Sequence, residues 1–205
     1  EEKEEKEEKE EGEDKEEEKK IEKKPNEFHS EWTFWFDKKI SNKKAPSDKF
    51  EDALLSLGSF STINDFWQLY AHITKPEDLP KSCNLRLFRN DIMPTWENYS
   101  GGGFWIVRFA RSSNALNRIW EELVFALIGE RFEDDGVVGV VLSLRKQEDY
   151  LSIWLKDNGI RFRVGEKLKQ VLNLDGSSHI EYKFISHSLR DRSTCRNSKS
   201  YALPQ

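Results

Sequence analysis

Seven short runs of aromatic and β-branched residues, separated by turn-forming residues, constrain the fold of this chain more than any other feature. Such runs are typical of β-strands. We predict strands at Trp32–Lys38, Leu54–Phe60, Asn84–Arg89, Phe104–Ala110, Val137–Leu144, Leu151–Leu155 and Ile180–Ser186. Because several neighbouring runs are joined by short connections, antiparallel pairing is the simplest arrangement.

Three other stretches repeat apolar residues at helical spacing. The first starts at Thr62-Ile-Asn-Asp65, which resembles a capping box, and continues through Phe66 and Tyr70. The other two stripes are Leu116, Ile119, Leu123 and Leu127, and Ile160, Val164, Leu168 and Val171. The chain therefore predicts an α+β fold, an antiparallel sheet with helices laid on one face.

Charge divides the chain into two parts. Residues 1–20 hold 13 Asp or Glu against 6 Lys and no apolar residue. Subtracting this −7 from the whole-chain −5 leaves +2 for the remainder. A segment without an apolar face has nothing to bury. We therefore expect a disordered tail over residues 1–25, one folded domain over 26–205, and flexible final residues, 190–205.

Composition also favours some classes of protein over others. No apolar run of about eighteen residues and no signal-peptide pattern is present, so we expect no membrane partner and a cytoplasmic location. Cys83 and Cys195 lack metal-ligand spacing and are predicted to be free thiols. The acidic stretch Glu133-Asp-Asp135, with Glu166, leaves open a metal site of a nucleotide hydrolase. An acidic turn is the more ordinary reading, and we predict a non-enzyme without metal or cofactor.

The segment Pro94-Thr-Trp-Glu97 places an indole beside a carboxylate, just before Gly101-Gly-Gly103. An aromatic side chain stacks on a nucleic-acid base for about 1–3 kcal/mol. The Glu97 carboxylate can accept two hydrogen bonds from N1–H and N2–H₂ of guanine. Methylation at N7 makes the guanine cationic and strengthens both contacts. Trp96 and Glu97 thus predict a reader of 7-methylguanosine. The alternative is a surface Trp that only covers an apolar patch.

A series of ordered motifs resembles the eukaryotic translation initiation factor 4E family, most closely its 4E-homologous-protein class. The motifs are Thr33-Phe-Trp-Phe36, Phe60-Ser-Thr-Ile-Asn-Asp-Phe-Trp67, His72-Ile-Thr-Lys-Pro-Glu-Asp-Leu79, Leu87-Phe-Arg-Asn-Asp-Ile-Met-Pro-Thr-Trp-Glu97, Gly102-Gly-Phe-Trp105, Leu127-Ile-Gly-Glu130, Ser143-Leu-Arg145, Ile153-Trp154, Val171-Leu-Asn-Leu174 and Glu181-Tyr-Lys183. The resemblance spans about Phe28 to Asn197. It implies a cupped eight-stranded antiparallel sheet with three helices on its convex face and an mRNA cap in the concave mouth.

The same resemblance implies roles for single residues in cap binding. Trp96 corresponds to one stacking jaw and Glu97 to the acceptor for the guanine edge. The second jaw is a Trp in the better-known class, where this chain has Ala45. In the 4E-homologous class it is a Tyr, at the position of Phe50. We predict that Phe50 stacks on the cap, and packing of Phe50 under its own loop remains the alternative.

Cap phosphates call for nearby cations. Arg145 matches the phosphate-binding Arg of the family, whereas two other family cations are replaced by Phe104 and Tyr150. Arg108 lies four residues after Phe104 on the same strand, so it faces the same side and is predicted to compensate. An ordinary solvated Arg is the alternative. Trp154 matches the Trp that touches the N7-methyl group, with plain burial in the sheet as the alternative.

A second predicted surface lies on the helices. Trp67 is about 100° round the first helix from Phe66 and should be exposed. The resemblance implies that Trp67, with Ile63, Glu121 and Gly129, receives a partner helix bearing the motif Tyr-x-x-x-x-Leu-φ. Glu121 fits the 4E-homologous class.

These observations predict a monomeric protein that binds capped mRNA and regulates translation initiation, as a weak cap competitor, a repressor or a selective initiation factor. Two alternatives stay open. One is a general initiation factor that recruits the initiation scaffold. The other is a scaffold that no longer binds the cap and uses only the Trp67 surface.

Overall fold

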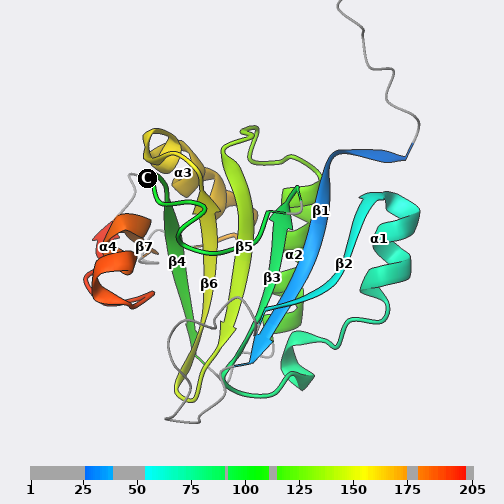
Figure 1. Cartoon of the computed structure of the whole chain (residues 1–205), viewed down its shortest axis with the longest axis horizontal. Helices are drawn as coiled ribbons and strands as arrows, with labels where there is room; N and C mark the ends of the chain where they lie inside the picture. Colours follow the sequence, from blue (N-terminus) through cyan, green and yellow to red (C-terminus); the bar gives the residue numbers. More distant parts are fainter. Residues whose placement is uncertain (1–25, 39–53, 91, 111–114, 175–179, 202–205) are drawn as a thin grey trace, which may run out of the picture.

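An eight-stranded antiparallel sheet forms the centre of the protein (Figure 1). The structure is a computed structural model that describes residues 26–38, 54–90, 92–110, 115–174 and 180–201. Its strands are β1 (Glu27–Lys38), β2 (Leu55–Thr62), β3 (Cys83–Arg89), β4 (Gly103–Ala110), β5 (Val137–Leu144), β6 (Glu148–Leu155), β7 (Ile180–Phe184) and β8 (Lys199–Tyr201). They lie side by side in the order β2-β1-β3-β5-β6-β4-β7-β8. The predicted fold is confirmed, and β8 is the strand that the sequence pattern missed.

Three helices pack on one face of this sheet, as predicted: α1 (Ile63–Tyr70), α2 (Leu116–Ile128) and α3 (Arg161–Val171). The capping box is confirmed, because the Thr62 hydroxyl accepts a hydrogen bond from the Asp65 amide at 3.1 Å. Two 3₁₀ turns, η3 (Pro76–Asp78) and η4 (Asn158–Ile160), lie in the connections. None of the helices in the described part of the chain is long and apolar enough to cross a membrane.

A fourth helix, α4 (Ile185–Asp191), was not predicted. The strand predicted up to Ser186 ends at Phe184. The Ile185 amide still makes the next in-register bond, to the Gly102 carbonyl at 3.0 Å, and the chain then turns into α4. The Ile185 side chain is buried on the sheet face opposite α1, α2 and α3, which we call the concave face.

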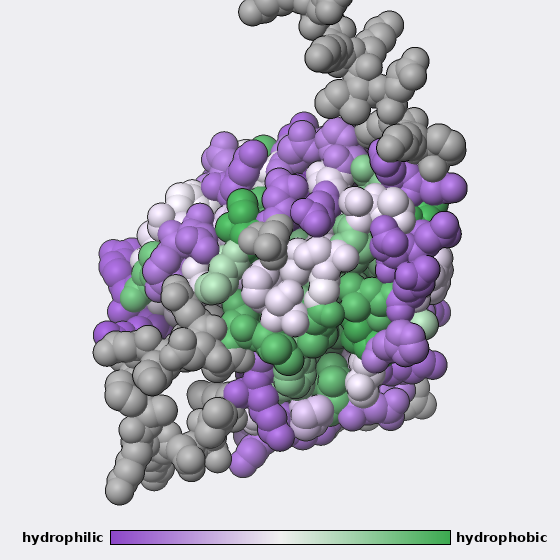
Figure 2. Space-filling model, turned by 45° about the vertical axis from the view of Figure 1, so that its right-hand side comes forward, coloured by the Kyte–Doolittle hydropathy of each residue, from purple (hydrophilic) through white to green (hydrophobic). Residues whose placement is uncertain are grey.

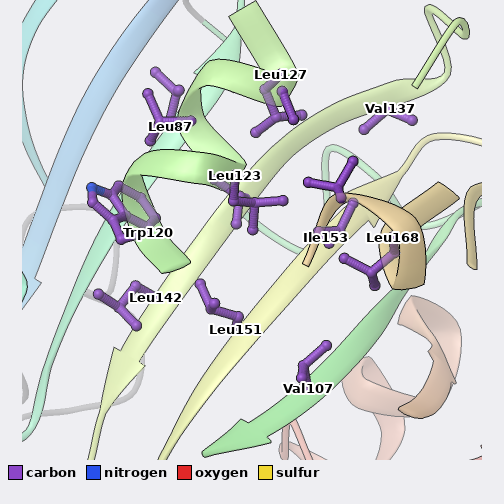
Figure 3. Packing of buried hydrophobic residues seen from close by; sticks show 14 of the residues in the cluster. Leu87, Val107, Trp120, Leu123, Leu127, Val137, Leu142, Leu151, Ile153 and Leu168 are labelled. Atoms are coloured by element: carbon purple, nitrogen blue, oxygen red, sulfur yellow. The ribbon is translucent and has the colours of Figure 1, made fainter. Parts of the chain in front are cut away.

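The convex core lies between the sheet and α2. Trp120 and Leu123 of α2 lie nearest Leu142 of β5 and Leu151 of β6, and Leu127 lies further along the same buried cluster (Figure 3). Alternate residues of each strand face this layer, as the two-residue period of a strand requires. The predicted helical stripe from Leu116 to Leu127 is therefore the buried face of α2.

The concave face is also apolar at its centre. Its residues, the concave cluster, are Trp35, Leu54, Phe88, Tyr99, Phe104, Ile106, Val138, Val141, Trp154 and Ile185. The rings of Trp154 and Phe104 stack with centroids 5.4 Å apart, and Phe88 meets Trp154 edge-on at 5.3 Å. Consequently β3 and β5 have no exposed residue on either side.

The turn from Asp191 to Ser198 is fixed to β7 by one lysine. Lys183 is fully buried, and its ammonium donates to both Asp191 carboxylate oxygens at 2.8 and 2.9 Å. The same ammonium donates to the carbonyls of Ser193 and Arg196. A buried cation needs such oxygens in place of water. Lys183 therefore holds the backbone of this turn against β7.

We predict that Lys183→Met loosens this turn. The substitution removes the ammonium donor from Asp191, which keeps its bonds from Ser193 and Asn197, and from the carbonyls of Ser193 and Arg196. Each carbonyl left unsatisfied costs about 1–3 kcal/mol. Trypsin should then cleave after Arg192 or Arg196 several-fold faster than in the wild type, measured by mass spectrometry of the fragments. Lys199→Met, at an exposed position, is the control. Equal cleavage in the wild type and Lys183→Met would contradict the assignment.

Candidate functional site

The connection from β3 to β4 carries Trp96 and Glu97 on a tight turn. The Tyr99 amide donates to the Trp96 carbonyl at 3.2 Å, and the Asn98 side-chain amide donates to the Met93 carbonyl at 2.8 Å. Trp96 is half-buried against the concave cluster, whereas Glu97 is exposed. One ring therefore borders the concave face while the neighbouring carboxylate is open to solvent.

Gly102, at the end of this turn, lies very close to the backbone of Leu155. A Cβ atom at Gly102 would lie 1.8 Å from the Leu155 carbonyl oxygen, far inside van der Waals contact. The Gly102 amide donates to the Tyr99 carbonyl at 2.9 Å, and its carbonyl accepts from Ile185. The glycine run thus lets the end of the loop lie directly on the end of β6.

Tyr99 and Trp154 form the floor beneath the loop. Their rings meet edge-on at 5.9 Å, and both side chains are buried. Among the described residues, the Tyr99 hydroxyl has no hydrogen-bond partner. Burial raises the pKa of Tyr99 to about 12, so this hydroxyl remains a donor at neutral pH. Trp154 lies on the predicted face, but buried under aromatic rings.

Arg145 follows β5 on the concave side. Its guanidinium donates to the carbonyls of Cys83 and Leu144 at 2.9 and 3.0 Å and to the Asn84 side chain at 2.7 Å. These contacts fix the direction of the side chain. A phosphate at this position would share the guanidinium with them.

Arg108 faces the concave side, as predicted, but two carboxylates hold it. Its Nε and Nη2 donate to Glu181 at 2.7 and 3.0 Å, and Nη1 donates to Glu148 at 2.7 Å. The hydrogen bonds to Glu181 raise the pKa of Arg108 above its ordinary value. Its charge is therefore already balanced. The predicted second jaw, Phe50, lies outside the described residues.

The acidic stretch considered as a metal site is used in ion pairs. Glu133 contacts Lys167 at 3.0 Å, Asp134 contacts Arg163, and Asp135 lies 3.5 Å from His29. Within the described ranges, no group of three or more His, Cys, Asp or Glu side chains is arranged to hold a metal ion. Each carboxylate of this stretch thus faces a different basic side chain.

An apolar patch on the helices surrounds Trp67. Trp67 is 52% exposed, Ile63 is 43% exposed and Phe125 of α2 is 40% exposed. The rings of Trp67 and Phe125 lie 5.9 Å apart. Gly129 caps α2 by donating to the Phe125 carbonyl at 2.9 Å. The predicted exposure of Trp67 is confirmed.

Phe125 was missed, although it lies off the buried stripe of α2 and one turn beyond Glu121, which places both on one helix face. Glu121 borders the patch through Tyr70. Burial and the Glu121 carboxylate raise the pKa of Tyr70 well above its ordinary value, so its hydroxyl remains protonated and hydrogen-bonds Glu121.

A pocket of about 320 Å³ lies near α1, on the side turned forward in Figure 2. It is lined by Phe36, Leu57, Leu69, His72, Ile73, Thr74, Leu79 and Leu85. Figure 2 shows apolar residues reaching the surface on this side within a frame of hydrophilic side chains.

Comparison with known proteins places this geometry in a family. The sequence model of "Eukaryotic initiation factor 4E" matches residues 27–200. A rice protein, "Eukaryotic translation initiation factor NCBP", is 37% identical over 81% of this chain and 74% of its own length. A tobacco protein, "Eukaryotic translation initiation factor isoform 4E", is 35% identical over 84% of this chain and 86% of its own length.

Solved structures of members of the same family also resemble this chain. Caenorhabditis elegans eIF4E-3, in complex with the 4E-binding protein Mextli, superposes with a TM-score of 0.72 at 30% identity, covering 80% of this chain and 95% of that one. Ascaris suum eIF4E-3, in complex with an m2,2,7G cap, has a TM-score of 0.71 at 31% identity, covering 78% and 91%. The chain belongs to the eukaryotic initiation factor 4E family.

We predict that Gly102→Ala disrupts the Trp96 loop, because the added methyl group overlaps the Leu155 carbonyl. Forcing such an overlap apart typically costs about 1–3 kcal/mol. Thermal unfolding should show a lower midpoint than in the wild type. Gly101→Ala is the matched control, since its nearest backbone atom would be 3.9 Å away. A Gly102→Ala variant as stable as Gly101→Ala would show that the loop can move away from β6.

Proposed function

We propose that this chain binds the 7-methylguanosine cap of mRNA and so regulates translation initiation in the cytoplasm. The observation that carries the proposal is the loop at the concave face, where half-buried Trp96 stands beside exposed Glu97. A stacking ring next to a free carboxylate is the pair that a cationic guanine requires. The Ascaris suum relative in complex with m7G cap supports this assignment.

In this proposal the base supplies most of the binding energy. Trp96 stacks on the guanine from one side and Phe50 from the other, while Glu97 accepts from N1–H and N2–H₂. Trp154 lies below, on the side of the N7-methyl group. No chemical step is involved, so the chain acts by occupancy and not as an enzyme.

The phosphates are held less strongly in the proposed complex. Arg145 is the proposed phosphate residue, but it also donates to Asn84 and two carbonyls. Arg108 is balanced by Glu148 and Glu181. Each phosphate contact has to compete with these groups. We therefore propose a cap protein of modest affinity, which favours a competitor, a repressor or a selective factor over a general one.

The patch around Trp67 is the proposed docking site for a partner. An exposed Trp on a helix is a typical anchor for an amphipathic partner helix. Ile63 and Phe125 extend the apolar area, while Glu121 and Gly129 border it. We propose that a helix with the motif Tyr-x-x-x-x-Leu-φ binds here, and the complex of the C. elegans relative with a 4E-binding protein supports it.

Titration of intrinsic fluorescence with 7-methyl-GTP and GTP tests cap binding. The wild type should show quenching that is selective for the methylated nucleotide. Glu97→Ala should lose about 10- to 100-fold in affinity, because two hydrogen bonds to a charged acceptor disappear. Ser100→Ala, exposed in the same loop, is the control. Retained selectivity in Glu97→Ala would exclude Glu97 as the reader, and a wild type without quenching would favour the scaffold that has lost cap binding.

Binding of a synthetic helical peptide with the Tyr-x-x-x-x-Leu-φ motif tests the second surface. Trp67→Ala should weaken peptide binding about 30-fold or more, as expected for a hot-spot Trp. Its affinity for 7-methyl-GTP should stay unchanged. Phe162→Ala is the control, since Phe162 is an aromatic residue of similar exposure on α3. Equal peptide affinity of the wild type and Trp67→Ala would rule out this docking site.

A further inference from the structure

An ion pair lies buried in the concave face, close to the Trp96 loop. The Arg86 guanidinium of β3 donates to Asp37 Oδ1 of β1 from Nε at 2.8 Å and from Nη2 at 2.6 Å. The two side chains are only 7% and 5% exposed. A buried ion pair is seldom more stabilising than apolar residues of the same volume. Its presence here therefore calls for a reason other than stability.

Arg86 has a further donor, and it points at the loop. Its Nη1 donates to the Pro94 carbonyl at 3.2 Å. Pro94 is buried and lies two residues before Trp96. A guanidinium held by two bonds to Asp37 can shift little, so it fixes the start of the segment that carries the indole and Glu97.

Asp37 also reaches the opposite side of the mouth. Its Oδ2 accepts from the Asn84 side-chain amide at 2.6 Å, and Asn84 is its cross-strand neighbour. The Asn84 carbonyl oxygen accepts from Arg145 Nη2 at 2.7 Å and from the Ser143 hydroxyl at 2.7 Å. One unbroken set of hydrogen bonds thus joins the Pro94 carbonyl to Arg145, with Asp37 in the middle.

We propose that Asp37 is a positioning residue that couples the guanine-reading loop to the phosphate-binding Arg145. The coupling rests on the proposed function. Through Arg86 the carboxylate sets the position of Trp96 and Glu97, and through Asn84 it sets the direction of the Arg145 guanidinium. Neither Asp37 nor Arg86 touches the cap. Such supporting residues are what hold a binding site in its productive geometry.

The coupling has a measurable consequence. 7-Methylguanosine, which has no phosphate, has no group for Arg145 to bind, whereas 7-methyl-GTP engages both ends of the mouth. The ratio of the two dissociation constants reports the phosphate contribution. If a residue supported only Arg145, its substitution would change this ratio and leave the affinity for 7-methylguanosine unchanged. If it supported only the fold, its substitution would weaken the binding of both ligands by the same factor.

We expect Asp37→Asn to weaken the binding of 7-methylguanosine about tenfold. We also expect the dissociation constant of 7-methylguanosine divided by that of 7-methyl-GTP to fall at least threefold, with both constants measured by fluorescence titration. Asp149→Asn is the matched control. Asp149 is equally buried and accepts from the Arg145 backbone amide at 3.0 Å, but the alternation of β6 places it with Leu151 and Ile153 on the opposite face of the sheet. It should leave 7-methylguanosine affinity unchanged. Wild-type affinity of Asp37→Asn for 7-methylguanosine would overturn the coupling.

A second variant covers the case in which Asp37→Asn, which removes the negative charge beside the buried Arg86, does not fold. Replacing both partners by apolar residues, Asp37→Leu with Arg86→Met, avoids a lone buried charge. This double variant should show the same loss of 7-methylguanosine binding, because the Pro94 tether is gone. Unchanged binding in the folded double variant would equally overturn the proposal.

Hydrogen exchange of the free protein separates this inference from the proposed function. The amides of Thr95 and Tyr99 make hydrogen bonds inside the loop. They should exchange faster in Asp37→Asn or the double variant than in the wild type. Equal exchange rates in the variants and the wild type would show that Asp37 and Arg86 do not hold the loop, even if the protein binds the cap. If the loop amides exchange faster in the variants but the wild type binds neither ligand, Asp37 does hold the loop through Arg86 and Pro94. The proposed cap binding, and with it the coupling to Arg145, would then be wrong.

Discussion

The central strands of the sheet have to be buried on both faces, and the rest of the structure depends on that constraint. β3 and β5 have no exposed residue on either side. Helices cover the convex face, which leaves the concave face to be covered by side chains, α4 and the loop of Trp96. The proposed cap site on this face is therefore built on a packed aromatic floor, with exposed groups such as Glu97 at its border.

Polar groups in such a face must satisfy one another, since burial without partners is costly. Asp37, Arg86, Asn84 and Arg145 do so across three neighbouring strands, because β1 and β5 both pair with β3. The relative positions of these four side chains therefore depend on the register in which the strands pair. A slip of one residue between β1 and β3 would place Asp37 on the convex side, away from Arg86.

The sequence predicted whatever depends on local patterns. β5 was predicted with both ends correct, and α1 was located by its cap at Thr62. The first two residues of α4, Ile185 and Ser186, were included in the strand prediction because Ile185 continues the apolar pattern of β7. β8 was missed because Lys-Ser-Tyr has no strand signature of its own and exists by pairing with β7.

The same division holds for the site. Trp96, Glu97 and the exposure of Trp67 follow from neighbouring residues, whereas the partners of Arg108 lie 40 and 73 residues away in the sequence. Those partners change what Arg108 can contribute, because a guanidinium already bonded to two carboxylates gains less from a phosphate than a solvated one. In the proposed cap complex, with Phe104 buried at the floor and Arg108 already paired, we expect the base to contribute more to recognition than the phosphate chain. The affinity of that proposed complex would depend on how well the loop holds Trp96 and Glu97, and the buried pair of Asp37 and Arg86 fixes the start of this loop.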